Sequence, residues 1–344
     1  MRLHFILLLF APMLLGAQQP SPTPSPSPTM DTVDRLKALD AEQLKQAIAT
    51  VREKHVEGAI LNETEMTRNT LRGLLDGLYP GLDLTDGKEV AAADAPFRTE
   101  VLDGKVGYLR LGSPGAEHLA LLDKALKDFS SKDIGGIVID LRATPESSDF
   151  AWSAQVCERF VPKDQVLFTL SRASGQPEEK FTSSAPSLFS GMIVVLVDSQ
   201  TAGAGEVIAA VLRAHAHAML VGGTTSGRAV EFASRDLGGG HHLRFAAAEV
   251  RVDGLPPLYP EGIEPDLDVP QDEQERETIL AESLEKGVAG FVFERGRVQM
   301  NEAALVAGTD PEIDVVDQSD PLLDRPLQRA VDLVTAIKLF RRRN

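Results

Sequence analysis

The sequence predicts an α/β fold, in which a mixed, largely parallel β-sheet is flanked by helices and preceded by a helical N-terminal arm. Three observations support this prediction. Apolar runs typical of buried strands alternate with helical patterns from residue 106 to about residue 221. The run Val194–Val197 is apolar at every position, as expected for a strand that is buried on both faces. Between residue 31 and about residue 80, apolar residues instead recur at helical spacing.

The first segment has the organisation of a secretory signal peptide. Residues 1–17 combine a basic start with the apolar run Phe5–Leu15 and the small residues Gly16 and Ala17. The apolar run is too short for a spanning helix. Residues 18–29 follow as a Pro/Ser-rich linker, which alternating prolines keep extended. The protein is therefore expected to be exported to the periplasm or the extracellular space, and to touch a membrane only if the signal segment stays uncleaved.

Residues 30–96 are expected to form the helical N-terminal arm. The stretches Asp40–Gln43 and Asn62–Glu65 both have the character of a capping box, which marks the start of a helix. Tyr79–Gly81, with its proline and glycine, should end the second helix. The stretch Leu82–Phe97 is then a short connection, rich in alanine and aspartate, to the core.

Residues 97–344 are expected to form the α/β core with a C-terminal helix. Its turns are polar or glycine-rich, and its final part changes from alternation to antiparallel strands at the edge of the core. The expected strands are 106–111, 137–141, 166–170, 193–197, 218–221, 229–235, 242–248 and 250–252; the expected helices are 116–129, 150–160, 206–214, 271–289 and 325–340.

Charge and composition exclude several classes of function. The formal net charge is −16, which argues against a nucleic-acid partner because phosphate binding requires a basic surface. Cys157 is the only cysteine, so neither an intrachain disulfide nor a thiolate zinc site can form. His215, His217 and the pair His241–His242 have no carboxylate at a ligand-like spacing, and we expect no metal and no cofactor.

The most informative stretch begins after the strand that ends at Val197. It contains Thr201-Ala202-Gly203-Ala204-Gly205-Glu206-Val207, followed by Thr225-Ser226-Gly227-Arg228-Ala229. These two segments resemble the S-A-S-A-S-E-I and T-F-G-K-G motifs of the carboxyl-terminal processing (tail-specific) serine peptidases. The middle serine of that family is the nucleophile and the lysine is the general base. The resemblance therefore implies that Gly203 and Arg228 stand at the nucleophile and base positions.

Further segments in the same order support the resemblance, which covers roughly residues 97–338. Residues 106–111 are similar to the family's G-Y-[IL]-R-[IL] strand, and residues 136–142 to its V-L-D-L-R strand. Residues 261–266 match the G-[IV]-x-P-D motif, and Asp320-Pro321 with the residues to Ala330 looks like the D-P-x-L-x-x-A ending. The resemblance implies the crotonase-like core of that family. The PDZ domain that the family usually inserts has no room between arm and core.

The departures from the family pattern bear on activity. Gly203 has no Oγ to form an acyl-enzyme, and Arg228 keeps its proton at any working pH. Glu146 stands where the family has oxyanion-loop glycines, and Phe232 stands where it has a glutamine that supports the base. We therefore predict that the chain is a pseudoenzyme with no intact catalytic set.

The predicted function is binding of a peptide or a protein C-terminus without cleavage. Thr201, Ala204, Glu146, Ser226 and Arg228 are the residues expected to line the former active site. Arg228 could pair with the carboxylate of a ligand through both arms of its guanidinium.

Three alternatives remain open from the sequence. The chain could be an active serine-type endopeptidase with displaced catalytic residues, drawn from Thr201, Ser226, Glu206 and the histidines. It could instead carry an apolar small molecule. It could also be a scaffold that acts through its helical arm, through which related proteins form homodimers.

Overall fold

The computed structural model describes residues 35–56, 62–88, 94–102, 105–172, 176–292 and 322–343. The predicted signal peptide and the linker lie outside the described residues. The chain divides into two compact units, with the boundary between Thr70 and Leu71. Within the described residues, no helix has both the length and the apolar character needed to cross a membrane.

The helical character predicted for the N-terminal arm is confirmed. Helix α2 spans Ala41–Lys54 and helix α3 spans Glu63–Gly77. At the start of α2 the backbone N–H of Gln43 donates to Asp40 Oδ1 at 2.8 Å, and the N–H of Asp40 donates to Gln43 Oε1 at 2.9 Å. These two bonds form the predicted capping box, which satisfies donors that the first helical turn leaves free. Neither helix contains a buried residue.

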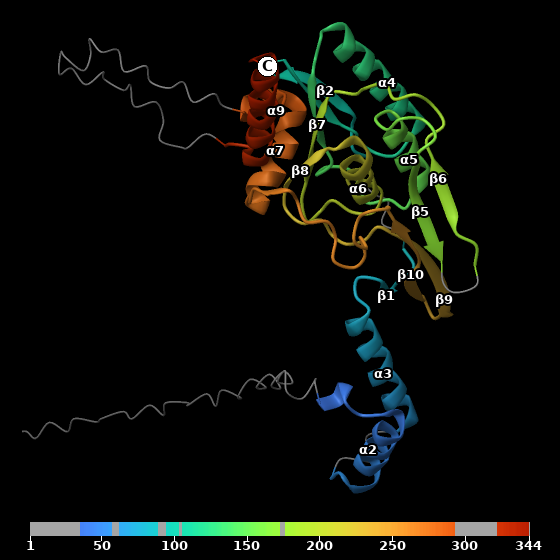
Figure 1. The fold of residues 1–344 in the computed structure, drawn as a ribbon. Helices are drawn as coiled ribbons and strands as arrows, with labels where there is room; N and C mark the ends of the chain where they lie inside the picture. Colours follow the sequence, from blue (N-terminus) through green and yellow to red (C-terminus); the bar gives the residue numbers. More distant parts are fainter. Residues whose placement is uncertain are drawn as a thin grey trace, which may run out of the picture. The chain divides into compact units, whose positions relative to one another are not determined.

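The central feature of the larger unit is a six-stranded sheet (Figure 1), and this confirms the predicted fold class. Its strand order is β11-β8-β7-β4-β3-β2, and all neighbours run parallel except β2 and β3. Strands β3 and β4 are buried along their whole length, which explains why they are largely apolar up to Arg110 and Asp140 at their ends. The strands are β2 (Arg98–Leu102), β3 (Val106–Arg110), β4 (Gly136–Asp140), β7 (Met192–Val197), β8 (Met219–Gly222) and β11 (Leu267–Asp268).

Helices cover both faces of this sheet. The apolar faces of α4, α5 and α6 build one core with the side chains of Ile137, Ile139 and Val195. On the opposite face, α9 packs against Val138, Val194 and other side chains of the same strands. Figure 1 shows α7 and α9 together on this second side, with α4, α5 and α6 on the first. The helices are α4 (Ala116–Ser131), α5 (Phe150–Glu158), α6 (Ala204–Ala216), α7 (Glu273–Lys286) and α9 (Arg325–Arg343); a short 3₁₀ helix, η2, spans Ala289–Phe291.

A second, antiparallel sheet corrects part of the predicted topology. The strand expected at 166–170 within the alternating core is β5 of this sheet, where it pairs antiparallel with β10 and β6. The two strands expected at 242–248 and 250–252 are one continuous strand, and the connection expected at Leu82–Phe97 contains β1. The strands of this sheet are β1 (Leu82–Thr85), β5 (Val166–Arg172), β6 (Glu179–Thr182), β9 (Val230–Gly238) and β10 (His241–Arg251).

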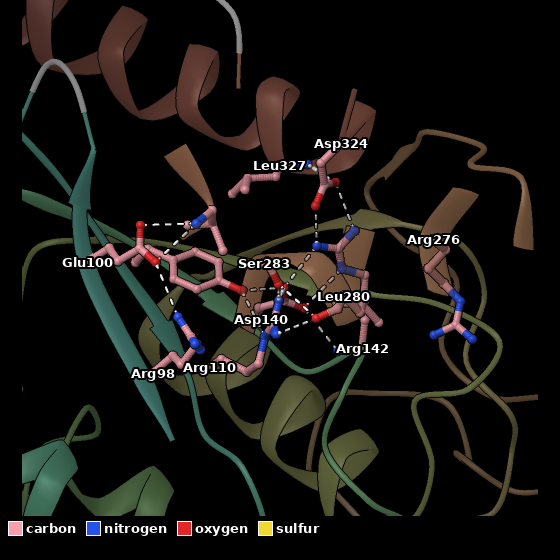
Figure 2. A network of polar contacts seen from close by, with 12 residues as sticks. Arg98, Glu100, Arg110, Asp140, Arg142, Arg276, Leu280, Ser283, Asp324 and Leu327 are labelled. Carbon is pink, nitrogen blue, oxygen red and sulfur yellow. Dashed lines mark hydrogen bonds and ion pairs between the residues drawn. The ribbon is translucent and has the colours of Figure 1, made fainter. Parts of the chain in front are cut away.

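A buried network of charges holds α9 against the parallel sheet (Figure 2). Arg142, just after β4, donates from Nε and Nη2 to the carboxylate of Asp140 at 2.9 and 2.8 Å. The same guanidinium donates from Nη1 and Nη2 to Asp324 at 2.9 and 2.8 Å. Asp324 in turn accepts the backbone N–H of Leu327 at the start of α9, at 3.0 Å. One arginine therefore joins the end of a central strand to the first turn of the last helix.

The network extends from Asp140 to α7. Tyr108 donates its hydroxyl to Asp140 Oδ2 at 2.7 Å, and Arg110 donates from Nε to the Tyr108 oxygen at 3.1 Å. Arg110 also donates to Ser283 Oγ at 3.1 Å and to the Leu280 carbonyl oxygen at 3.4 Å. Two strands and two helices thus share one set of buried, mutually satisfied charges.

This network makes a prediction about acid stability. Burial alone would raise the pKa of Asp140, but Arg142, Arg110 and the Tyr108 hydroxyl together hold that pKa well below its ordinary value of 3.8. A lowered pKa means that the unfolded chain binds the proton more tightly, so the stabilisation is complete above pH 3.8 and is lost as the pH falls below it. We expect the side-chain ¹³C resonance of Asp140 to stay unchanged from pH 7 down to pH 3.8. A titration midpoint at or above the ordinary value would contradict the assignment.

Candidate functional site

The candidate site starts at the turn between β7 and α6. Asp198 Oδ1 accepts the backbone N–H groups of Gln200 and Thr201, both at 3.0 Å, and the Thr201 hydroxyl at 3.2 Å. Thr201 is fully buried. Its hydroxyl therefore closes the turn, and it does not point toward a ligand as the sequence predicted.

Gly203 follows in a backbone conformation that only glycine adopts readily. Its φ and ψ are 51° and −115°, and a Cβ at this position would lie 2.4 Å from the carbonyl oxygen of Ser147. The backbone N–H of Ala204 donates to the same oxygen at 2.8 Å. The β4–α5 connection thus lies directly over the turn, and its carbonyl occupies the space next to Gly203.

Glu206, in the first turn of α6, joins the two segments that the sequence singled out. Its buried carboxylate accepts five hydrogen bonds, three of them from backbone N–H groups. Burial raises the pKa of Glu206, and the hydrogen bonds oppose this without cancelling it. The donors are the N–H of Gly203 at 3.1 Å, Thr225 Oγ1 at 2.6 Å, Ser226 Oγ at 3.3 Å, and the N–H groups of Gly227 and Arg228, both at 2.7 Å.

The loop at 225–228 is also fixed from its other side. Gly227 has a φ of 69°, and a Cβ there would lie 1.9 Å from the carbonyl oxygen of Pro260. The Thr225 hydroxyl accepts the N–H of Ile263 at 2.8 Å, while it donates to Glu206. The backbone that presents Arg228 is therefore held at both ends.

Arg228 forms an ion pair with Glu146. Arg228 Nη2 lies 2.8 Å from Glu146 Oε2, and Arg244 Nη2 on β10 lies 3.6 Å from Glu146 Oε1. Arg244 is held in place by Phe232, because its Cζ lies 3.4 Å from the centroid of that ring. Phe232 thus orients an arginine.

The structure brings most of the predicted site residues together. Gly203, Ala204, Ser226, Arg228 and Glu146 are linked through Ser147 and the Glu206 carboxylate, whereas Thr201 lies below the turn. The hydroxyls of Thr201 and Ser226 are bonded to carboxylates. Among the described residues, no group of three or more His, Cys, Asp or Glu side chains is placed to hold a metal ion.

Two contributors to this site, Ser147 and Arg244, and one to the buried network, Asp324, were not found from the sequence. Ser147 acts through its backbone carbonyl, which leaves no side-chain pattern, and Arg244 comes from a strand of the second sheet. Asp324 could have been found: it precedes Leu327 and Ala330 at the spacing of the D-P-x-L-x-x-A ending, without the second-position proline. The residues assigned to that ending, Asp320 and Pro321, lie outside the described part of the chain.

Comparison with known proteins finds similarity in the part of the chain that contains these segments. The model of peptidase family S41 matches residues 105–269. The carboxy-terminal processing protease CtpB of Bacillus subtilis is 26% identical over 200 residues, which cover 56% of this chain and 41% of that protein. A carboxyl-terminal-processing protease of Synechocystis is 28% identical over 166 residues, covering 48% of this chain and 38% of that protein.

Solved structures give a similar comparison. The photosystem II D1 C-terminal processing protease superposes with a TM-score of 0.46 at 23% identity, covering 61% of this chain and 52% of that chain. The chain spans about two-fifths of the length of the two curated relatives described above. Residues 105–269 of the chain therefore belong to peptidase family S41, and this part is homologous to the carboxyl-terminal processing proteases.

Proposed function

We propose that this chain is a non-proteolytic member of its family, which holds a peptide at the site around Gly203 without cutting it. Gly203 carries this proposal. The residue at the position of the family's serine has no side chain, and the Ser147 carbonyl oxygen lies 2.4 Å from where a Cβ would be. A nucleophile at this position would require the β4–α5 connection to move.

The neighbouring groups support the same conclusion. The backbone N–H that follows a nucleophile commonly stabilises the oxyanion of the transition state. Here that N–H belongs to Ala204 and is bonded to the Ser147 carbonyl at 2.8 Å. Arg228, at the position of the base, stays protonated and is paired with Glu146 at 2.8 Å. In this proposal the nucleophile and the base are replaced, and the oxyanion donor is already occupied by a carbonyl of the protein itself.

The fixed arrangement of the Gly203 turn and the loop of Arg228 supports peptide binding. Glu206 still fixes the Gly203 turn and the loop of Arg228 relative to each other. The relatives are named for processing carboxyl termini. A chain that keeps this backbone arrangement without the catalytic side chains is expected to bind a carboxyl-terminal segment without cutting it.

The proposal extends to location and organisation. Residues 1–17 would direct export to the periplasm or extracellular space. No PDZ domain would separate the arm from the core, because only Leu82–Phe97 connects them. The arm would then be the part available for pairing with a second copy.

The proposal can be tested with β-casein, an unstructured protein, as the candidate substrate. We expect the purified chain to leave β-casein intact on a gel time course and to bind a fluorescein-labelled, unstructured peptide in an anisotropy titration. Cleavage that survives repurification and is abolished by Ser226→Ala would overturn the non-proteolytic part. Absence of peptide binding would overturn the binding part.

The double variant Gly203→Ser/Arg228→Lys, with Arg228→Lys as its control, tests the steric argument. We expect both to be inactive as well, because the added Cβ meets a backbone carbonyl that cannot rotate away. Cleavage by the double variant alone would show that the β4–α5 connection yields, and that the lost side chains are the only defect.

A further inference from the structure

We infer that Arg228 and Arg244 form a binding site for the terminal carboxylate of a peptide, and that Glu146 fills this site in the free protein. The inference rests on the proposed peptide-binding function and adds the ligand group, a second anchoring residue and an internal competitor. It starts from the position of one carboxylate between two guanidinium groups, at 2.8 Å and 3.6 Å.

The two arginines come from separate parts of the fold and are oriented independently. Arg228 is placed by its backbone N–H, which donates to Glu206 at 2.7 Å. Arg244 is placed by stacking on Phe232. Arg244 is therefore held independently of Glu146, and the backbone that carries Arg228 stays fixed when the glutamate leaves.

The carboxylate of Glu146 leaves part of the hydrogen-bonding capacity of the two arginines unused. The Arg228 Nε and Glu146 Oε1 atoms are buried and have no hydrogen-bond partner among the described residues. The contact of Oε1 with Arg244, at 3.6 Å, is too long for a hydrogen bond. Arginine binds a carboxylate most strongly through two parallel N–H···O bonds, which this arrangement does not achieve. A carboxylate that is not tied to the β4–α5 connection can approach Nε and Nη2 of Arg228 together.

Exchange of one carboxylate for another does not require unfolding. The side chains of Arg228, Arg244 and Glu146 are 31%, 36% and 33% exposed. Ion pairs with this degree of exposure contribute little to stability, so Glu146 can swing out at small cost. Two cations facing one anion also leave a local positive charge in a protein whose net charge is −16.

The site lies next to the proposed path of the peptide. Glu146 is adjacent in sequence to Ser147, whose carbonyl covers Gly203 and bonds to Ala204. Departure of Glu146 from the arginines therefore also loosens the segment that covers the turn. A chain terminus bound at the arginines would in this way open the space that the rest of the peptide needs.

The experiment compares a fluorescein-labelled ten-residue peptide that has a free carboxyl terminus with the same peptide amidated. Anisotropy titrations are run on the parent chain, Glu146→Gln, Arg244→Gln and the control Arg251→Gln, whose arginine lies on the same strand but pairs with Glu249. Circular dichroism and thermal melts verify that each variant is folded.

We expect the parent to bind the free-carboxyl peptide at least tenfold more tightly than the amidated one. Glu146→Gln should tighten binding of the free-carboxyl peptide severalfold, and by more than it tightens binding of the amidated peptide. Arg244→Gln should remove the difference between the two peptides, whereas Arg251→Gln should preserve it.

Equal binding of both peptides by every variant would overturn the carboxylate site and leave the proposed peptide binding intact. Absence of binding of either peptide by all variants would overturn both. A competition experiment with laurate distinguishes a peptide terminus from a fatty acid as the source of the carboxylate. Displacement of the labelled peptide by laurate but not by unlabelled free-carboxyl peptide would overturn the assignment to a peptide terminus.

Discussion

Replacing Arg142 with methionine is expected to lower the free energy of unfolding by about 3–5 kcal/mol, because it leaves Asp324 without its cation and Asp140 with only the longer ion pair to Arg110. Arg142 is 4% exposed, and its partners Asp140 and Asp324 are 0% and 2% exposed. Methionine retains much of the side-chain volume, so the loss of unfolding free energy would come from the missing charge and not from a cavity. Urea denaturation followed by circular dichroism measures the effect.

Arg159→Met is the matched control. Its guanidinium also binds one carboxylate closely, with Nε 2.9 Å from Asp123 Oδ1, but the two side chains are 18% and 34% exposed. Pairs of this kind contribute at most about 1 kcal/mol. Equal losses for Arg142→Met and Arg159→Met would contradict the structural role of the buried network.

Glu206→Ala is expected to have the second large effect, a loss of at least about 3 kcal/mol, because each buried donor left without a partner costs about 1–3 kcal/mol. The carboxylate accepts from Thr225 and Ser226 as well as from three backbone N–H groups. The effect should also be local, with faster hydrogen exchange of the Gly227 and Arg228 amides than of the β4 amides.

Glu206→Gln provides the comparison. The glutamine has nearly the same shape, but its NH₂ group would face donors and not acceptors, so an intermediate loss is expected. Exchange of the loop amides that stays unchanged in Glu206→Ala would show that Glu206 does not hold the loop of Arg228, and would remove a support for the proposed function.

The parallel core could be predicted from sequence because its central strands are buried on both faces and are therefore apolar at most positions. Residues 137–141 and 193–197 were predicted as strands on this basis, and the structure has β4 at Gly136–Asp140 and β7 at Met192–Val197. Four other strands, β1, β2, β6 and β11, were not predicted. They lie at sheet edges and mix polar with apolar residues over two to five positions, which gives no distinctive pattern.

Strand pairing was harder to predict than strand location. The stretch at 166–170 was correctly expected to be a strand, but its apolar residues fit a parallel core and an antiparallel sheet equally well. Direction depends on partners far away in sequence, which one sequence does not reveal. The second sheet was therefore anticipated only at its β9–β10 part.

The candidate site was predictable where the chemistry depends on residue identity. The spacing of Gly203 and Arg228 predicted the place of the site, and the absence of a serine and a lysine at these two positions led to the prediction of lost catalysis. The contacts that close the site were not predictable, since the Ser147 carbonyl is common to all residues and Arg244 arrives through β10. The expectation that Arg228 faces a ligand did not anticipate its pairing with Glu146.

The bridge between Arg142 and Asp324 has a consequence for biosynthesis. The two residues are 182 positions apart, so the ribosome makes the arginine long before its second acid. During most of translation, Arg110 and Arg142 would share Asp140 as the only acid of this network. The charge of this network is therefore balanced only once Asp324, at the start of α9, has been made. A core whose strands precede α9 in the sequence thus depends on this later segment for its electrostatic balance.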